Sequence, residues 1–213
     1  MSKITGIKIA KGHKKRVKVF LDGEPALGLL AETVRQEKLK TGQEIDQSRI
    51  GILESQDKLQ RCLNAALRLL GYRPRSEKEL KQRLQRHGFE SDCIDKALDK
   101  LKEQGLVDDI AFARFWKENR ETFSPRSRRL TRLELRRKGL SGDVIEQVIG
   151  EIDDSASAYQ AALKRAPRLA GTDFQEFRQR LGGYLGRRGF NYSIINEITE
   201  RVWKEQKTKT KNK

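Results

Sequence analysis

The sequence is short of the residues that build metal sites, disulfide frameworks and membrane spans. Its 213 residues include two cysteines, Cys62 and Cys93, whose spacing fits neither a zinc pair nor a disulfide framework. The N-terminus has no apolar core of a signal peptide, and no stretch approaches the roughly 18 apolar residues of a membrane span. These absences predict a protein of a reducing cytoplasm without a membrane partner.

Catalytic groups are also scarce. No phosphate loop of the G-x-x-x-x-G-K-[ST] type occurs, and the two histidines, His13 and His87, stand beside basic residues with no evident nucleophile or carboxylate partner. Asp108 and Asp109 open a helix, where carboxylates satisfy free N–H groups, so capping is favoured over metal binding. The sequence therefore predicts no enzymatic activity, no cofactor and no metal site.

Positive charge is what the sequence has in excess. Lysine and arginine outnumber acidic residues 46 to 30, which gives a net charge of +16. Equal shares of hydrophobic and charged residues, 36% each, favour many solvated helices over one thick core. The charge indicates a polyanionic partner, most often nucleic acid, although ribosomal or membrane-surface binding would explain it equally well.

Residues 1–55 are predicted to form a small β-hairpin element with a short helix. Apolar and polar residues alternate between residues 4 and 29, and Asp22-Gly23 is a typical hairpin turn. Pro25 would sit badly in a central strand, so the run that follows the turn is predicted to be a sheet edge. A helix over about 31–38 is expected to cover one face.

Three similar helical units follow. The phrases LQRHGF, LRRKGL and LGRRGF begin at Leu84, Leu135 and Leu185, which are 51 and then 50 residues apart. Apolar residues recur with a helical period in three segments of each unit. The predicted fold is mainly α, with tandem three-helix repeats in an elongated array because stacked repeats contact only their neighbours. The predicted repeats are 56–108, 109–153 and 154–205, followed by a basic disordered tail, 206–213.

The basic residues before each repeated glycine admit a simple interpretation. The glycine follows the last turn of a helix, where a left-handed residue lets the chain leave and cations face the negative end of the helix dipole. Arg86, Arg187 and Arg188 are interpreted in this way. Gly186–Gly189 also fits the GXXG loop of KH domains, which the all-helical setting disfavours.

The middle copy carries more charge than a helix end requires. Residues 126–138 contain seven basic residues and one acidic residue. Several arginines share one arc of the helix, and neighbouring like charges repel, so the stripe is expected to destabilise its own helix. Two interpretations of this helix face are therefore equally supported: it binds an anion, or it is an ordinary solvated face. The residues predicted to face a filament or nucleic acid are Arg126, Arg128, Arg129, Arg132, Arg136 and Arg137.

Three groups of residues resemble the RecX family of bacterial regulatory proteins. They are Arg73-Pro-Arg-Ser with Glu79-Leu80, Gly105-Leu-Val-Asp-Asp109 with Phe112-Ala113, and Ser127-Arg-Arg with Glu134-Leu135 and Lys138-Gly139. The resemblance covers most of residues 57–152, and the VFLDGE hairpin resembles an N-terminal extension of some members. Thr131 departs from the apolar residue usual in the second repeat of the family.

The resemblance implies a curved, elongated protein that binds the RecA recombinase and its DNA filament. Members usually inhibit strand exchange and ATP hydrolysis, and the family has no catalytic residues to transfer. The expected partners are the RecA filament and single- or double-stranded DNA, and the chain is expected to be a monomer. The alternative is a stand-alone DNA- or RNA-binding helical repeat protein without a RecA partner. Both end-capping and groove-coating of filaments stay open.

Overall fold

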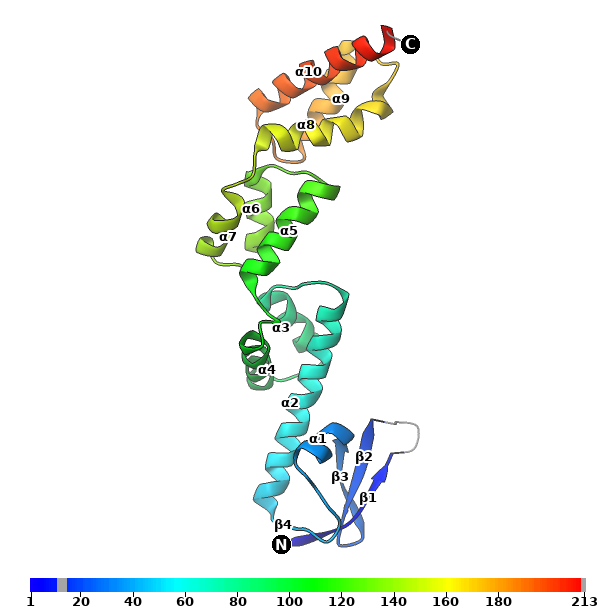
Figure 1. The fold of residues 1–213 in the computed structure, drawn as a ribbon, viewed down its shortest axis with the longest axis vertical. Coiled ribbons are helices and arrows are strands. Elements are labelled where there is room, and N and C mark those ends of the chain that lie inside the picture. Colours follow the sequence, from blue (N-terminus) through cyan, green and yellow to red (C-terminus); the bar gives the residue numbers. More distant parts are fainter. Residues whose placement is uncertain (11–14, 212–213) are drawn as a thin grey trace. The chain divides into compact units, whose positions relative to one another are not determined.

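The chain forms two compact units, Met1–Val107 and Asp108–Lys213. The structure is a computed structural model that describes residues 1–10 and 15–211, with side chains up to residue 208. Figure 1 shows the course of the chain through both units.

The N-terminal unit begins with a four-stranded antiparallel sheet of order β3-β2-β1-β4. The β2–β3 hairpin turns at Asp22 and Gly23, whose φ angles of 50° and 92° belong to the primed turns of two-residue hairpins. The predicted hairpin is confirmed, and β3, which carries Pro25, lies at a sheet edge as predicted. The elements are β1 (Ser2–Ile9), β2 (Arg16–Leu21), β3 (Glu24–Leu30), α1 (Ala31–Gln36) and β4 (Glu44–Ile45).

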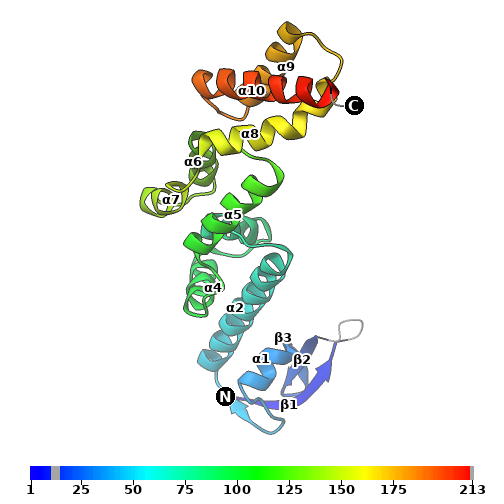
Figure 2. The same ribbon diagram turned by 45° about the horizontal axis from the view of Figure 1, so that its top comes forward.

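One face of this sheet is buried against α1 and the first half of α2 (Gln47–Tyr72), as Figures 1 and 2 show. The carboxylate of Asp57 on α2 is buried. It accepts hydrogen bonds from the Leu30 backbone N–H at 2.5 Å and from Thr33 Oγ1 at 3.3 Å, and it pairs with Arg61 Nε at 3.1 Å. This carboxylate fixes α2 to the junction of β3 and α1.

α2 is one continuous helix of 26 residues, and the predicted domain boundary between residues 55 and 56 falls inside it. The helix begins ten residues before the predicted start near residue 57, after Asp46, whose side chain accepts from the Arg49 N–H at 2.7 Å. Leu53 lies in the core under the sheet, whereas Cys62 lies in the core of the first helical bundle. One helix thus serves two cores.

The first three-helix bundle consists of α2, α3 (Glu77–Arg86) and α4 (Ser91–Glu103). Ser76 caps α3 by accepting from the Glu79 N–H at 3.2 Å, as the capping pattern predicted. α3 ends before Gly88, whose φ of 82° lets the chain leave the helix. The first repeat therefore has the predicted three-helix form.

The C-terminal unit contains two further three-helix bundles, so three tandem three-helix repeats in a mainly α chain are confirmed. The second bundle comprises α5 (Asp109–Phe123), α6 (Arg128–Arg137) and α7 (Gly142–Ile149). The third comprises α8 (Asp154–Arg165), the 3-10 turn η1 (Ala166–Leu169), α9 (Phe174–Gly186) and α10 (Tyr192–Lys211). None of the described helices has the length and apolar content needed to cross a bilayer.

The repeats keep a common register. Leu84, Leu135 and Leu185 occupy one position of the repeat, and each is fully buried. Thr131 is 1% exposed and takes the place that Leu80 has in the first repeat. The second repeat therefore buries a smaller polar side chain at the same repeat position.

α10 continues as a helix through Lys211, although a disordered tail was predicted from residue 206. Tyr159 Oη donates to Glu205 Oε2 at 2.8 Å, and Lys207 Nζ lies 5.0 Å from the centre of the Trp203 ring. Because each residue added to an existing helix gains a backbone hydrogen bond, these contacts extend a polar segment that could not nucleate a helix alone. Residues 212–213 lie outside the described residues.

Candidate polyanion interface on the second repeat

α6 carries five of the six arginines predicted to face a polyanion, and Arg126 lies just before it. Ser127 caps the helix by accepting from the Leu130 N–H at 3.2 Å. The backbone N–H of Ser127 donates to the Arg188 carbonyl at 3.0 Å, so the start of α6 is held by the loop that follows α9. The third repeat thus fixes the first turn of the arginine-bearing helix.

Arg126 is held by a shared carboxylate, that of Glu134 on α6. Glu134 is 9% exposed, and its Oε2 accepts from Trp116 Nε1 and Arg120 Nε, each at 2.8 Å, while its Oε1 pairs with Arg126. Burial, with the nearby charges of Arg120 and Arg188, lowers the pKa of the Arg126 guanidinium. Arg126 is therefore part of a half-buried ion network inside the second repeat.

Arg128 and Arg132 also have partners within the C-terminal unit. Arg128 Nη2 donates to the Ile152 carbonyl at 2.6 Å. Arg132 forms a two-pronged pair with Glu146 on α7, with both N–O distances 2.8 Å. The repulsion expected within the stripe is partly offset, because Arg132 pairs with Glu146, while Glu134 pairs with Arg126 just before the helix.

The Arg132–Glu146 pair has a counterpart in the first repeat. Lys81 and Asp95, each 51 residues earlier, form an ion pair with an Nζ–Oδ1 distance of 2.6 Å. A link between the second and third helices at this position thus occurs in two repeats. Arg132 therefore has a structural explanation that needs no external anion.

The remaining arginines, Arg129, Arg136 and Arg137, are exposed, and within the described part of the chain their guanidinium groups form no hydrogen bond or ion pair. Arg129 and Arg136 are seven residues apart and share one helix face. Arg137 lies in the last turn of α6, where a cation stabilises the helix end. Arg129 and Arg136 are thus the side chains best placed for an outside anion.

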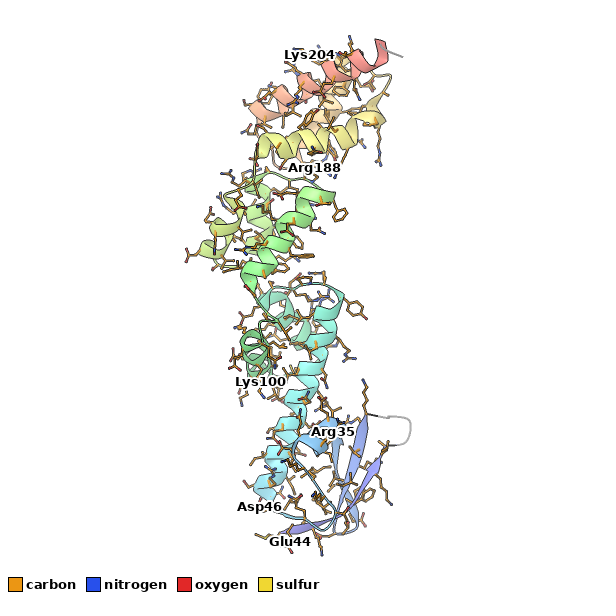
Figure 3. The ribbon with its side chains drawn as sticks, viewed as in Figure 1. Arg35, Glu44, Asp46, Lys100, Arg188 and Lys204 are labelled. Atoms are coloured by element: carbon orange, nitrogen blue, oxygen red, sulfur yellow. The ribbon has the colours of Figure 1, made fainter. Side chains whose placement is uncertain are left out.

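The Gly186–Gly189 segment forms part of the junction between the second and third repeats. The Arg188 guanidinium, labelled in Figure 3, lies 3.9 Å from the centre of the Tyr184 ring. Gly189 has a φ of 86°, and a Cβ there would lie 2.6 Å from Ser127 Oγ and 2.8 Å from Leu130 Cβ. Close packing against α6 disfavours the interpretation of this segment as a nucleic-acid clamp.

The other residues considered as possible sites are an aspartate, a cysteine and the two histidines. Asp108 caps α5 by accepting from the Ile110 and Ala111 N–H groups at 2.7 and 3.1 Å, as predicted. Burial raises the pKa of the Cys62 thiol to about 12. The described residues contain no group of three or more metal-ligating side chains. His87 is an exposed residue at the end of α3, and His13 lies outside the described residues.

Models of the RecX family match four segments of the chain. The model described as "Regulatory protein RecX N-terminal domain" matches residues 2–46, and those of the first, second and third three-helix domains match 62–101, 108–149 and 152–199. A protein named "Regulatory protein RecX" from Clostridium botulinum (strain Eklund 17B / Type B) is 30% identical over 205 residues, which cover 94% of this chain and 96% of that protein. The chain belongs to the RecX family.

Other RecX proteins extend this finding. "Regulatory protein RecX" of Chlorobium phaeobacteroides (strain BS1) is 35% identical over 144 residues, 68% of this chain and 95% of that protein. A crystal structure of regulatory protein RecX has a TM-score of 0.70 at 24% identity, covering 94% of this chain and all of that one. RecX from Lactobacillus salivarius gives 0.57 at 24% identity, with 68% and 97% coverage. The structures share the fold, and the family is one of regulatory proteins.

The arginines of α6 lie in the segment matched by the second three-helix domain of RecX. The sequence identified the helix and its excess of charge. The sequence alone did not show which arginines have ion-pair partners. Glu134 was seen as the one acidic residue in the basic run, but its partners were not predicted, and Glu146 lies on another helix. The recurrence of the Lys81–Asp95 spacing was a usable signal for the second pairing.

Proposed function

We propose that this chain binds the RecA recombinase and its DNA filament and inhibits ATP hydrolysis and strand exchange. Membership of a regulatory family and the resemblance of the repeat motifs support a regulatory role, and the net charge of +16 suits a filament that contains DNA. The chain acts as a cytoplasmic monomer and needs no cofactor.

The proposed site rests on one observation: the arginines on and just before α6 fall into a group with internal partners and a group with none among the described residues. Arg126, Arg128 and Arg132 are held by internal acceptors. Arg129 and Arg136 extend from one face into solvent, where a guanidinium can form two-pronged contacts with a phosphate or carboxylate. Exposed Arg137 adds a third charge beside them. These three side chains contact the bound DNA or an acidic surface of the filament.

The test replaces Arg129, Arg136 and Arg137 together by glutamine, which is a good helix former and keeps much of the arginine stem. If three phosphates are contacted, the slope of log affinity for DNA against log salt falls by about 2 to 3. The concentration needed to inhibit the DNA-dependent ATPase of RecA should rise at least about tenfold, which corresponds to 1.4 kcal/mol.

The matched control replaces Lys78, Lys96 and Lys100 by glutamine. These lysines are exposed on α3 and α4 of the first repeat, and their removal changes the net charge by the same amount. Inhibition by the control should change less than about threefold. Equal losses in both variants, or normal inhibition by the folded arginine variant, would rule out a specific role for α6.

The second candidate function is nucleic-acid binding without a RecA partner, which the same exposed arginines would also support. Pull-down with purified RecA, and binding to single-stranded DNA with and without RecA and nucleotide, distinguish the two. The proposal expects binding to increase sharply when the RecA filament is present. Unchanged binding, together with no capture of RecA, would favour the stand-alone role.

A further inference from the structure

The N-terminal sheet has a second face that no helix among the described residues of its own unit covers, as Figures 1 and 2 show. Val17, Val19 and Leu21 point into the core, so the alternating residues of β2 point to the opposite face. Those residues are Arg16, Lys18 and Phe20. Exposed Lys8 on β1 lies on the same face as its cross-strand partner, Lys18.

The pairing of Lys8 with Lys18 is unfavourable for the fold. The two residues are directly opposite each other in the antiparallel β1–β2 ladder, where side chains of like charge repel. Lysine on an exposed edge protects a sheet from aggregation, and this explains Lys8, which lies beyond the part of β1 that pairs with β4. It does not explain Lys18, because β2 is hydrogen-bonded on both sides.

The same face carries an aromatic ring, that of Phe20, two residues after Lys18 on β2. Phe20 is half-buried, and a Cβ built on its neighbour Gly6 would lie 3.7 Å from its ring. On β3, the cross-strand partners of Phe20 and Lys18 are Pro25 and Gly28; both are exposed, as is Ala26. Lys8 Nζ lies 5.2 Å from the centre of the Phe20 ring. Because the Lys8 ammonium lies over the ring, a planar group that stacks on Phe20 would displace it toward the edge of the ring.

The charges around the ring are mostly of one sign. Arg16 is partly engaged, because its Nη2 donates to the Gly28 carbonyl at 2.7 Å. The acidic residues of the sheet are not cross-strand partners of Lys8 or Lys18: Asp22 lies in the β2–β3 turn, exposed Glu24 at the start of β3 is paired with Leu21, and Glu44, labelled in Figure 3, is paired with Lys3. A ligand over Phe20 thus meets positive charge on both strands.

We propose that the outer face of the N-terminal sheet binds single-stranded nucleic acid, with one base stacked on Phe20 and the flanking phosphates held by Lys8 and Lys18. An aromatic side chain on an open sheet among basic residues suits unpaired bases, since a duplex keeps its base faces hidden. A membrane surface or an acidic peptide would use the lysines without needing the ring. This site is separate from α6 and does not depend on the RecA proposal.

The experiment measures the affinity of the full chain for a fluorescent oligothymidylate, for an abasic oligomer of the same length, and for a duplex. Lys8→Gln with Lys18→Gln should reduce the slope of log affinity against log salt by about 1.4 on the single strand, or 0.7 for each phosphate contact. The control is Lys96→Gln with Lys100→Gln on α4, which should leave the slope within about 0.3 of the parent.

Phe20→Leu tests the stacking. It should weaken binding to oligothymidylate by about tenfold and binding to the abasic oligomer by less than about twofold. Phe20→Tyr, which keeps the ring, should bind like the parent, and this separates stacking from loss of fold. Thermal melting of each variant checks that the sheet is intact.

Several results would overturn the assignment. Equal effects of the two lysine pairs would mean that only total charge matters. Equal effects of Phe20→Leu on oligothymidylate and the abasic oligomer would exclude base stacking. If the lysine variant lost as much affinity for the duplex as for the single strand, the face would be a general anion surface. None of these outcomes changes the result for α6, because the arginines there are intact in every variant.

Discussion

Replacing Glu134 by glutamine should destabilise the C-terminal unit more than the loss of any exposed ion pair. The Glu134 carboxylate serves Arg120, Arg126 and the indole N–H of Trp116 at once. Glutamine keeps an oxygen for Trp116 but removes the charge that both guanidinium groups face. Breaking a buried ion pair by removing one partner costs about 3–5 kcal/mol. The arginine side chains are 22% and 30% exposed, so water offsets part of this loss, and we expect about 2–3 kcal/mol.

Urea denaturation followed by tryptophan fluorescence measures this cost directly. Both tryptophans of the chain, Trp116 and Trp203, lie in the C-terminal unit, so the signal follows that unit. Glu146→Gln is the control, because Glu146 is an exposed partner of Arg132, and its loss should cost about 1 kcal/mol or less. In the Glu134→Gln background, Arg126→Met should recover part of the stability by removing a charge that has lost its partner.

The reasoning would be refuted if Glu134→Gln cost no more than Glu146→Gln. It would also be refuted if Arg126→Met destabilised the Glu134→Gln variant as much as the parent, since the two residues would then not be coupled.

Three other measurements have defined outcomes. Gly189→Ala should cost more than about 2 kcal/mol, because its Cβ would clash with Ser127 and Leu130. Gly171→Ala has a similar φ of 87° but open space around the Cβ, so urea titration should show only about 1 kcal/mol of backbone strain. Because burial raises the pKa of Cys62 to about 12, alkylation of this thiol at pH 8, followed by mass spectrometry, should be at least about a hundredfold slower in the folded protein than in urea. Small-angle scattering should give a radius of gyration clearly above the roughly 17 Å of a compact chain of this length, and a value near 17 Å would contradict an elongated array.

The helical repeats could be predicted because their signals are local. A glycine with positive φ and a helical apolar period depend on a few neighbouring residues, and Gly88, Gly139 and Gly189 have φ angles of 82°, 91° and 86°. The continuity of α2 through the predicted boundary at residue 55 was not predicted, because its two halves contact different cores and a local apolar period does not show that. The tail was misjudged because Glu205, just before it, has its partner Tyr159 46 residues away on α8, a contact that local sequence does not show. The contact of Lys207 with Trp203 is local, since the two residues are four positions apart on α10.

The ion-pair partners of the arginines could not be predicted from local sequence, because they lie on other elements. Comparison of the repeats nevertheless identifies some of these partners. A charge that recurs at the same repeat position with an opposite charge at matched spacing is best explained by the fold, as with Lys81–Asp95 and Arg132–Glu146. Arg137 has Arg86 and Arg187 at equivalent positions, where a cation suits the end of a helix. Arg136 has Gln85 and Gly186 instead, so neither the repeat nor an internal partner accounts for its charge. The charge of α6 that the repeat leaves unexplained is thus smaller than its count of arginines. Arg136 is the clearest case, whereas Arg129, on the same face, has a cation, Lys78, at the equivalent position of the first repeat.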